Sequence, residues 1–437
     1  MKRVNVALLG LGTVGTGTYK MLQSNQDVIA RKTGTLFEVR RILVRDLTKK
    51  RKVEGVGHLL TTRFEDVLDA GVQVVIEAMG GIEPTRTYVV KAIEAGCHVV
   101  TANKELIAKH GVELEQLARE KGVQLLYEAS VGGGIPVLGT LQHLLKANRI
   151  HKVSGIVNGT CNYILTQMAE HGRSFDSVLA EAQEKGYAEA DPTADVEGFD
   201  SAHKLAILCR LAFGVDVKVE DIPRKGITDI TVAELEIARR LGYSIKLLAQ
   251  AEQYGEEGPV ALQVAPTLVP LSHPLSGVRG VYNAIHVEGD VVQDVTLVGQ
   301  GAGEQPTGSA VVEDLCNVYR LPVLRAASLR RPMILPAGEE SGLQFLLIET
   351  EDVLPADTAD KWKADLLDTG IQVLDALIYP DHGRSHAAFL VRNWEPRLVS
   401  VLPAEWEVSV KRIITRPVLA ASVSQEETEM VGVGSVS

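Results

Sequence analysis

Long apolar runs are absent from this chain of 437 residues. None reaches the roughly 18 residues that a helix needs to cross a membrane, so we expect a protein that does not span one. The first residues, Met1-Lys2-Arg3 and the apolar stretch after them, resemble a secretory leader, but Asn5 interrupts the stretch and no small-residue cleavage site follows. We therefore expect no signal peptide.

Cysteine is scarce, and no basic patch offsets the acidic composition. The four cysteines, Cys97, Cys161, Cys209 and Cys316, are too far apart for a zinc knuckle or a disulfide framework, so we expect a reducing, cytoplasmic location. The formal net charge is −11, and Lys and Arg are not gathered into a patch that would follow phosphates, which argues against nucleic-acid binding. With 45% hydrophobic and 23% charged residues, the chain has a globular composition, and its length suggests about three domains.

Residues 1–133 alternate between apolar strand-like runs and amphipathic helical stretches. The alternation predicts βαβ units and a parallel sheet, and nearly continuous Val, Ile and Leu indicate strands covered by helices on both faces. We predict a doubly wound α/β domain of the Rossmann type, with strands over Val4–Leu9, Phe37–Val44, Val72–Glu77, His98–Thr101 and Val123–Glu128.

Residues 134–330 mix helical and strand-like stretches without a regular alternation, which we interpret as an α+β domain; the family resemblance described below implies that this domain serves substrate binding, catalysis and dimerisation. The expected elements are helices over Val137–Ala147, Cys161–Glu170 and Glu197–Phe213, a strand over Lys152–Val157, and further strands beyond Ala261.

Residues 338–421 show the order strand, helix, strand, strand, helix, strand, which is typical of a ferredoxin-like unit. The expected strands are Leu343–Glu349, Gln372–Ile378, Ala387–Val391 and Val408–Ile414, and the helices lie over Thr358–Thr369 and near Pro396. Residues 422–437 hold too little apolar mass for a core, and we predict that they are disordered.

A glycine motif follows the first expected strand, in the order Gly10-Leu11-Gly12-Thr13-Val14-Gly15. Gly10 permits a tight turn, Gly12 lets the backbone approach a pyrophosphate, and Gly15 allows close packing of the helix. The N–H groups at the start of that helix, where Thr13 and Val14 lie, attract the anion. A glycine turn without a ligand is the alternative, but the βαβ context favours a dinucleotide.

The second expected strand ends at Val44-Arg45-Asp46, where the ribose of the adenosine is expected. Arg45 can pair with a 2′-phosphate, which favours NADP, whereas Asp46 can accept ribose hydroxyls, which leaves NAD open. A solvated charge pair at a strand end is the alternative to both.

The segment AQEKGYAEADPTADVEGFDSAHK (182–204) is rich in carboxylates and ends on a lysine. On the helix expected after Gly198, Asp200 and Lys204 are four residues apart and share a face. Taken alone, such a pair is most often a surface ion pair of little energetic value.

This segment resembles the signature of homoserine dehydrogenases, in which Ala and Gly are followed by Asp-Pro, an Asp and then Gly-x-Asp-x-x-x-Lys, and it matches without a gap. Further blocks resemble the same family in the same order: Gly10–Gly15, Thr101–Lys104, Ser130–Pro136, Asn158–Tyr163 and Gly299–Gly303. The resemblance implies an enzyme that reversibly reduces L-aspartate 4-semialdehyde to L-homoserine with NAD(P)H, in threonine, methionine and isoleucine biosynthesis.

The resemblance also implies roles for single residues. Lys204 matches the residue that gives a proton to the carbonyl oxygen as hydride arrives, and such a group is needed because negative charge builds on that oxygen. Asp200 and Glu189 match substrate-binding positions, suited to an α-ammonium group. Lys104 matches a lysine beside the nicotinamide and the substrate. The family pattern adds Gly186 and Gly301 to the cofactor-binding residues.

Glu128, Val131, Gly133 and Ile135 match family positions that bind a monovalent cation, sodium in the family pattern, largely through backbone carbonyl oxygens. A glycine-rich bend is compatible with such binding. A plain interdomain hinge remains the alternative for this bend.

The C-terminal unit resembles an ACT domain, a module associated in long homoserine dehydrogenases with feedback inhibition by threonine. ACT domains commonly carry an Asp-x-x-Gly loop after the first strand, whereas residues 351–357 (EDVLPAD) contain no glycine. Threonine binding and a purely structural or oligomerising role therefore both stay open. The resemblance implies a homodimer or homotetramer.

Two other functions fit parts of the sequence. A phosphorylating semialdehyde dehydrogenase needs a cysteine nucleophile, for which Cys161 is the candidate, but no histidine occupies a recognisable partner position. A regulatory protein that senses a dinucleotide and an amino acid without catalysis needs no proton donor, so the joint presence of Lys204, Asp200, Glu189 and Lys104 argues against it.

Overall fold

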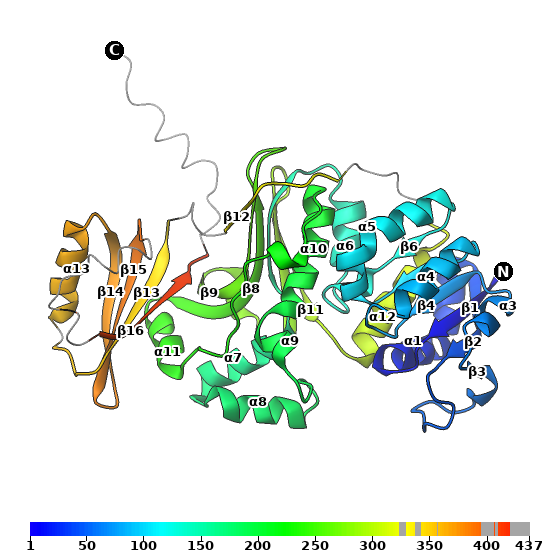
Figure 1. Cartoon of the computed structure of the whole chain (residues 1–437), viewed down its shortest axis with the longest axis horizontal. Coiled ribbons are helices and arrows are strands. Elements are labelled where there is room, and N and C mark those ends of the chain that lie inside the picture. The colour runs from blue at the N-terminus through cyan, green and yellow to red at the C-terminus, as the bar shows by residue number, and fades with distance from the viewer. Residues whose placement is uncertain (323–328, 337–341, 356, 395–405, 407–409, 420–437) are drawn as a thin grey trace, which may run out of the picture.

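The protein is described from a computed structural model, which covers residues 1–322, 329–336, 342–355, 357–394, 406 and 410–419. Three units lie side by side along the long axis of the molecule: an N-terminal α/β unit, a central sheet with its helices, and a small C-terminal sheet (Figure 1). Within these ranges, no helix is both long enough and apolar enough to cross a membrane.

The N-terminal unit contains a parallel six-stranded sheet. Its elements are β1 (Lys2–Leu9), α1 (Thr13–Ser24), α2 (Gln26–Thr33), β2 (Thr35–Leu43), β3 (Leu60–Thr61), α3 (Glu65–Asp69), β4 (Val74–Glu77), α4 (Thr85–Glu94), β5 (His98–Thr101), α5 (Lys104–Glu120) and β6 (Leu125–Leu126). The strand order β3-β2-β1-β4-β5-β6 is that of a doubly wound dinucleotide-binding fold, which confirms the prediction. The short β3 was not predicted, and β6 stops early because a 3₁₀ turn, Glu128–Ser130, follows it.

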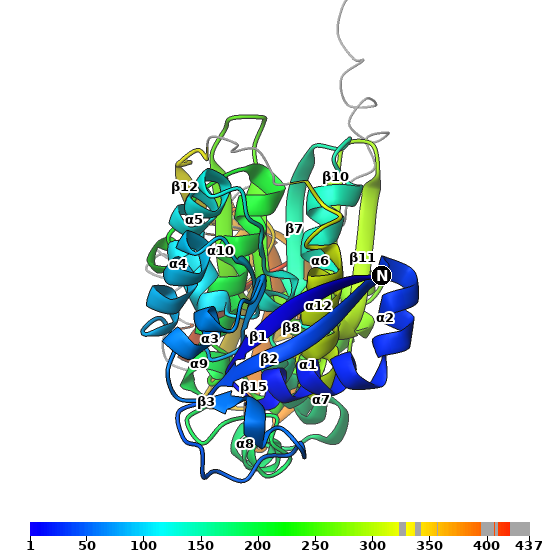
Figure 2. The ribbon, with the colours of Figure 1, turned by 90° about the vertical axis from the view of Figure 1, so that its right-hand side faces the viewer.

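Helix α12 (Glu304–Asn317) packs into the core of the N-terminal unit although it follows the central sheet in sequence. Figure 2 shows α12 beside α1 on one side of β1 and β2, with α4 and α5 on the other. The contact is close because Gly17 has no side chain: a Cβ there would lie 1.8 Å from the Glu304 carbonyl oxygen. Val311 shares a buried cluster with Val6. The range 1–133 expected for the first domain therefore leaves out one helix of its core.

The central unit is built on a mixed six-stranded sheet in the order β11-β10-β7-β8-β9-β12. Its strands are β7 (Ile150–Ile156), β8 (Tyr243–Gln253), β9 (Val260–Pro270), β10 (Tyr282–Gly289), β11 (Gln293–Gln300) and β12 (Ile334–Pro336). Its helices are α6 (Val137–Gly139), α7 (Gly159–His171), α8 (Phe175–Glu184), α9 (Thr193–Val196), α10 (Phe199–Phe213) and α11 (Val232–Arg240).

Two helices of the central unit differ from expectation. The helix predicted over Val137–Ala147 is only α6, continued by a π-helical segment over Thr140–Leu144. Helix α10 begins at Phe199 rather than Glu197, because Gly198 before it has a left-handed backbone (φ +81°). Strand β12 lies beyond residue 330, where the second domain was expected to end, and it pairs in parallel with β9.

The C-terminal unit is a four-stranded antiparallel sheet in the order β14-β15-β13-β16, with helix α13 (Thr358–Asp368). The strands are β13 (Gln344–Thr350), β14 (Gln372–Asp381), β15 (Arg384–Arg392) and β16 (Val410–Pro417). This order is that of the predicted ferredoxin-like unit. The helix expected near Pro396 and the tail 422–437 lie outside the described residues.

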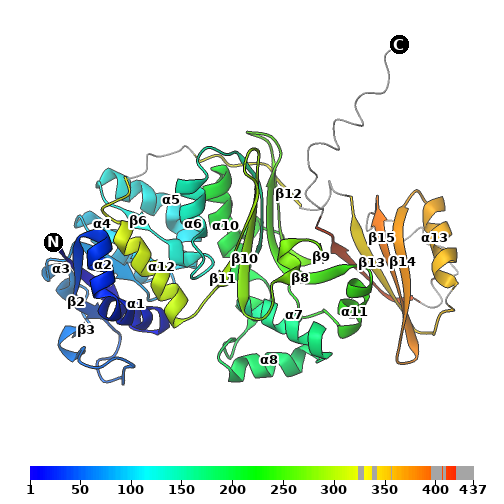
Figure 3. The same cartoon turned by 180° about the vertical axis from the view of Figure 1, so that it is seen from behind.

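The C-terminal unit is docked on the central one through β16, which lies near β9 and α11 (Figure 3). Arg416, fully buried, donates from Nε to Glu234 at 2.7 Å and from Nη2 to Asp229 at 3.0 Å. The Leu419 backbone N–H donates to the Leu268 carbonyl at 2.8 Å. Buried charges need partners, so this ion pair fixes where β16 can lie.

Candidate active site

The glycine motif forms the turn between β1 and α1. Gly10 has φ +98°, and a Cβ there would lie 2.6 Å from the Ala78 carbonyl oxygen, while a Cβ at Gly15 would lie 2.2 Å from the Gly10 carbonyl oxygen. Both positions therefore require glycine for packing. Gly12 is different, because a Cβ there would meet no atom within 4 Å. The open space beside Gly12, at the start of α1, where Thr13 and Val14 follow, is where a pyrophosphate fits.

A cavity of about 400 Å³ adjoins this turn and contains Arg45 and Asp46. The Asp46 carboxylate accepts hydrogen bonds from the hydroxyl and the backbone N–H of Thr48, both at 2.7 Å. These bonds, the hydroxyl bond first, hold the pKa of Asp46 below its ordinary value. Lys49 and Arg51 line the same cavity, and Arg51 donates to the Asp46 carbonyl. Sequence analysis missed these two cations, although the run of Lys and Arg at residues 49–52 was a visible signal.

The predicted catalytic residues meet where α5 and α10 begin. Lys204 Nζ donates to Asp200 Oδ2 at 2.7 Å and to the Val157 carbonyl at 2.6 Å. Lys104 Nζ lies 2.6 Å from the other oxygen of Asp200. Residues 100 positions apart in the chain thus share one buried carboxylate, which helix periodicity alone did not indicate.

Burial and charge set the protonation of this cluster. Burial raises the pKa of Asp200, but the charges of Lys204 and Lys104 outweigh it, so the pKa lies below its ordinary value and Asp200 is ionised. Burial lowers the pKa of Lys204, and the Asp200 charge offsets this only in part. The charge of Asp200 raises the pKa of Lys104, whose side chain is 43% exposed. Lys204 is therefore the lysine that more readily gives up its proton.

Asn158 and Asp195 belong to the same network, although sequence analysis gave them no role. Asn158 caps α7 and its amide nitrogen donates to Asp200 at 2.9 Å and to Asp195 at 2.7 Å. Burial raises the pKa of Asp195. Both residues lie in blocks that carry the family resemblance. An Asn at the start of a helix is also a common N-cap, so the sequence alone did not mark Asn158 as a site residue.

Glu189 and Gly186 lie at the exposed edge of the site. Glu189 is close enough for its charge to raise the pKa of Lys104, after the larger effect of Asp200. Gly186 ends α8 with φ +72°, and a Cβ there would meet no atom within 4 Å. Its place among the cofactor-binding residues rests on the family resemblance alone.

The loop with the expected cation ligands lies between the N-terminal and central units. The Glu128 carboxylate accepts from the backbone N–H groups of Leu138 and Gly139, at 2.8 and 2.6 Å. A Cβ at Gly133 would lie 2.5 Å from Gly301, so these two glycines hold the loop against the residues after β11. Val131 and Ile135 are buried in the same loop. Across the part of the chain that is described, no three His, Cys, Asp or Glu side chains group as metal ligands.

Asp314, on α12, is a buried carboxylate next to this loop that sequence analysis missed. It accepts from the Glu128 backbone N–H at 2.8 Å. Burial, and then the charge of Glu128, raise its pKa well above the ordinary value. Neither carboxylate forms an ion pair with a Lys or Arg among the described residues.

Cys161 is unsuited to nucleophilic catalysis. It is fully buried in α7, and its Sγ donates to the Asp195 carbonyl at 3.2 Å. Burial, and then the charges of Asp195 and Asp200, raise the pKa of the thiol well above its ordinary value, whereas a reactive cysteine needs a lowered one. This geometry removes the candidate nucleophile of a phosphorylating semialdehyde dehydrogenase.

Family models match both halves of the site. Residues 10–128 match "Homoserine dehydrogenase, NAD binding domain" and residues 136–316 match "Homoserine dehydrogenase". The homoserine dehydrogenase of Bacillus subtilis is 47% identical over 321 residues, which is 73% of this chain and 74% of that protein.

Solved structures extend the similarity to the C-terminal unit. A crystal structure of a homoserine dehydrogenase from Thiobacillus denitrificans has a TM-score of 0.84 and 38% identity, over 96% of this chain and 99% of that one. A hyperthermophilic archaeal homoserine dehydrogenase "in complex with NADPH" has a TM-score of 0.62 and 27% identity, over 74% and 100%. With its glycine turn, its lysine–aspartate cluster and both family models in place, the chain belongs to the homoserine dehydrogenases, NAD(P)-dependent oxidoreductases of aspartate-family amino-acid biosynthesis.

Proposed function

We propose that Lys204 is the group that transfers the proton when L-aspartate 4-semialdehyde is reduced to L-homoserine. The observation that carries this is the buried Lys204 ammonium, held 2.7 Å from an ionised Asp200. A bound NAD(P)H supplies the hydride. Lys204 gives its proton to the carbonyl oxygen as negative charge develops there, and takes the proton back in the oxidising direction.

Asp200, Glu189 and Lys104 hold the substrate in this proposal. Asp200 already forms ion pairs with two lysines, so its main effect is to position their ammonium groups and to favour their protonated forms. Lys104 is half exposed and can reach the α-carboxylate of a substrate, whereas Glu189, exposed at the same edge, suits the α-ammonium group.

The cofactor contacts favour NADP. Gly12 and the start of α1 offer open space and N–H groups for the pyrophosphate, with Gly186, Gly301 and Lys104 on the nicotinamide side by family resemblance. Arg45, Lys49 and Arg51 surround the position of a 2′-phosphate, while the Asp46 carboxylate already accepts two hydrogen bonds from Thr48. A ribose hydroxyl would therefore compete with Thr48 for the Asp46 carboxylate, whereas a 2′-phosphate could pair with several cations.

A monovalent cation, sodium by family resemblance, fits the loop of Glu128, Val131, Gly133 and Ile135. The supporting observation is the pair of carboxylates, Glu128 and Asp314, that have no Lys or Arg ion pair within the described ranges. A bound cation would favour the ionised form of both carboxylates, and hard cations prefer carboxylate and carbonyl oxygens.

A cytoplasmic homodimer or homotetramer is the assembly that we propose. Strand β11 is an unpaired edge of the central sheet, and Val298 on it is 56% exposed, which suits pairing with a second copy.

The test of the catalytic proposal is nicotinamide reduction with L-homoserine, with NAD and NADP compared side by side. We expect turnover with both and a lower KM for NADP. Absence of turnover with either cofactor would overturn the proposal.

A further inference from the structure

A cavity of about 910 Å³ lies at the junction of the N-terminal and central units, on the far ends of the helices that carry the catalytic lysines. Lys104 lies in the first turn of α5 and Lys204 in the second turn of α10, whereas the cavity is lined by residues between 112 and 120 of α5 and by Arg210 and Leu211 of α10. At 1.5 Å per residue, Glu115 is about 16 Å along α5 from Lys104. The cavity is thus separate from the catalytic cluster, and its size is that of a small-molecule site.

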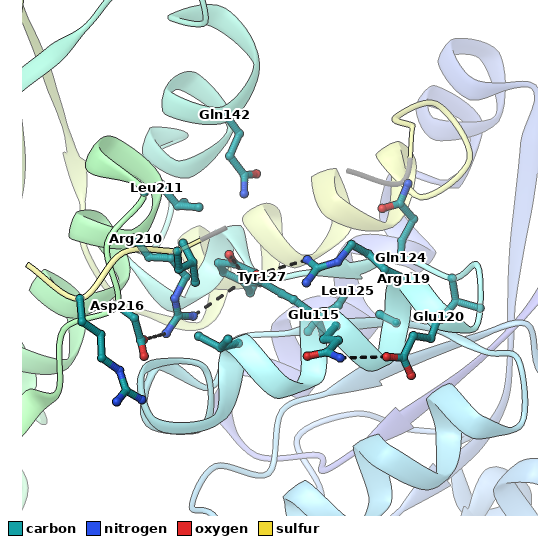
Figure 4. A pocket seen from close by; sticks show the side chains of 17 residues that line it. Glu115, Arg119, Glu120, Gln124, Leu125, Tyr127, Gln142, Arg210, Leu211 and Asp216 are labelled. Carbon is teal, nitrogen blue, oxygen red and sulfur yellow. Dashed lines mark hydrogen bonds and ion pairs between the residues drawn. The ribbon is translucent and has the colours of Figure 1, made fainter. Parts of the chain in front are cut away.

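Arg210 is the buried cation of this cavity, with only 4% of its surface exposed. Its two terminal nitrogens donate to the carbonyls of Ile107 and Ala108, at 3.1 and 3.3 Å. Asp216 and Glu115 lie at 3.7 and 3.9 Å, which is too far for hydrogen bonds (Figure 4). Arg210 Nε has no hydrogen-bond partner among the described residues, which is costly for a buried donor.

The chain makes room for this guanidinium at the expense of helix stability. Gly111 lies in the middle of α5, where glycine is about 0.5–1 kcal/mol less favourable than alanine. A Cβ at Gly111 would lie 2.2 Å from Arg210 Nη1, so only glycine admits the side chain.

Three arginines, Arg119, Arg210 and Arg331, line the cavity together with three carboxylates, Glu115, Glu120 and Asp216. Glu120 accepts from the Gln116 amide at 2.9 Å. Glu115 already accepts from the Tyr127 hydroxyl at 2.6 Å and lies 3.8 Å from Arg119. Arg331, at the rim, forms no ion pair with any residue of the described chain. Three guanidinium groups therefore line one hollow without a carboxylate at hydrogen-bond distance.

From this arrangement we infer that the cavity is a binding site for a small molecule that carries a carboxylate, held by Arg210, Arg119 and Arg331. Guanidinium groups bind carboxylates through paired, charge-assisted hydrogen bonds, and among the described residues Arg119 and Arg331 have no carboxylate at hydrogen-bond distance. Because α5 belongs to the N-terminal unit and α10 to the central one, the ligand contacts both units, and its binding favours one arrangement of the two.

The carboxylate can belong to an amino acid or to a plain organic acid, and two probes of equal length separate these. L-Glutamate and glutarate differ only in the α-ammonium group. We expect saturable heat in calorimetric titrations of the full chain with at least one of them. Preference for glutamate assigns an amino-acid ligand, with Asp216 as the partner of its ammonium, and preference for glutarate assigns a plain carboxylate.

Variants locate the binding. Arg331→Gln and Arg119→Gln should each weaken it about tenfold or more, the effect of losing one charge-assisted hydrogen bond, whereas Arg63→Gln, an exposed arginine elsewhere, should not. Binding should persist in Lys204→Ala. The inference is overturned if neither probe gives saturable heat up to about 10 mM, if both arginine variants bind like the unmodified chain, or if Lys204→Ala abolishes binding, which would place the ligand in the active site.

Discussion

Lys204 is the residue whose removal tests the proposed chemistry most directly. Lys204→Ala should lower kcat by about 10²-fold or more, the scale of general acid–base assistance, and leave cofactor binding almost intact because Lys204 does not line the cavity beside the glycine turn. Steady-state kinetics with L-homoserine and fluorescence titration with NADPH measure the two effects. Unchanged turnover would show that another group moves the proton.

The pH dependence of the same reaction has a defined sign. Homoserine oxidation needs Lys204 neutral, so that it can accept a proton, and burial lowers its pKa from the ordinary 10.5. The rate should therefore rise with pH and level off below the pKa of free lysine. In Lys204→Ala this rise should disappear, whereas a rise that persists there would report a different base.

Arg45 tests the cofactor preference. Arg45→Ala should raise the KM for NADP by about tenfold or more and change that for NAD much less, because only NADP carries the phosphate with which the guanidinium pairs. Arg63→Ala, an exposed arginine outside this cavity, is the matched control. Equal effects on both cofactors would remove Arg45 from the site.

The proposed cation site can be tested through the effect of sodium on stability and through the Glu128→Gln variant. If sodium offsets the charges of Glu128 and Asp314, the melting temperature should rise when sodium chloride replaces choline chloride at equal ionic strength. Glu128→Gln should reduce this difference. A melting temperature that is the same in both salts would leave the loop a plain hinge.

At the scale of elements, the contact between α1 and α12 depends on Gly17. Alanine normally stabilises a helix relative to glycine, but a Cβ at Gly17 would lie 1.8 Å from a backbone oxygen of α12. Gly17→Ala should therefore lower the free energy of unfolding by about 1–3 kcal/mol, as overpacking does. Urea unfolding measures this, and Gly57→Ala, where a Cβ meets nothing within 4 Å, is the control. Equal stability of the two variants would contradict the close packing.

The bounds of the helices and strands show which elements could be predicted from sequence patterns. The buried strands β1, β4 and β5 lie within a few residues of their predicted bounds, because continuous apolar runs between helices have few other solutions. The π-helical segment after α6 and the two-residue strand β3 did not follow from any pattern.

At the scale of the whole molecule, the structure decides where the C-terminal unit can be removed. A cut after Pro332 would delete β12, which pairs with β9 in the central sheet, whereas a chain ending at Pro336 keeps it. All residues assigned to chemistry precede both cuts. We expect the chain ending at Pro336 to turn over homoserine with reduced stability, because it loses Arg416 and the contacts of Leu419. An inactive but folded chain would show that the C-terminal unit is needed for catalysis.

The same two chains test regulation by threonine. If the ACT-like unit binds threonine and the amino acid favours a less active state, the intact chain should be inhibited and the truncated chain should not. The two units are connected by the ion pairs of Arg416 with Glu234 and Asp229, so we expect threonine binding to act on the central unit through these contacts. Calorimetry with threonine that shows no heat, together with no inhibition, would leave the unit a structural or oligomerising one.

The sequence by itself determined the class of the fold and the family. Apolar periodicity and the glycine spacing gave the dinucleotide-binding unit, and the gapless motif of residues 182–204 gave the family, because both signals are local in the chain. Arg45, Asp200 and Lys204 were predicted in this way. In the structure Lys204 contacts Asp200, and Arg45 lines the cavity beside the glycine turn.

Only the tertiary structure decided which distant residues act together. Lys104 reaches Asp200, Asn158 bridges Asp200 and Asp195, Asp314 lies beside Glu128, and α12 returns to the first core, and none of these pairs is close in sequence. The shift in the pKa of Lys204 has the same origin, since burial and the approach of Asp200 exist only in the folded chain. Local patterns fix which residues can do chemistry, whereas the packing of helices against sheets fixes their neighbours and therefore their charge.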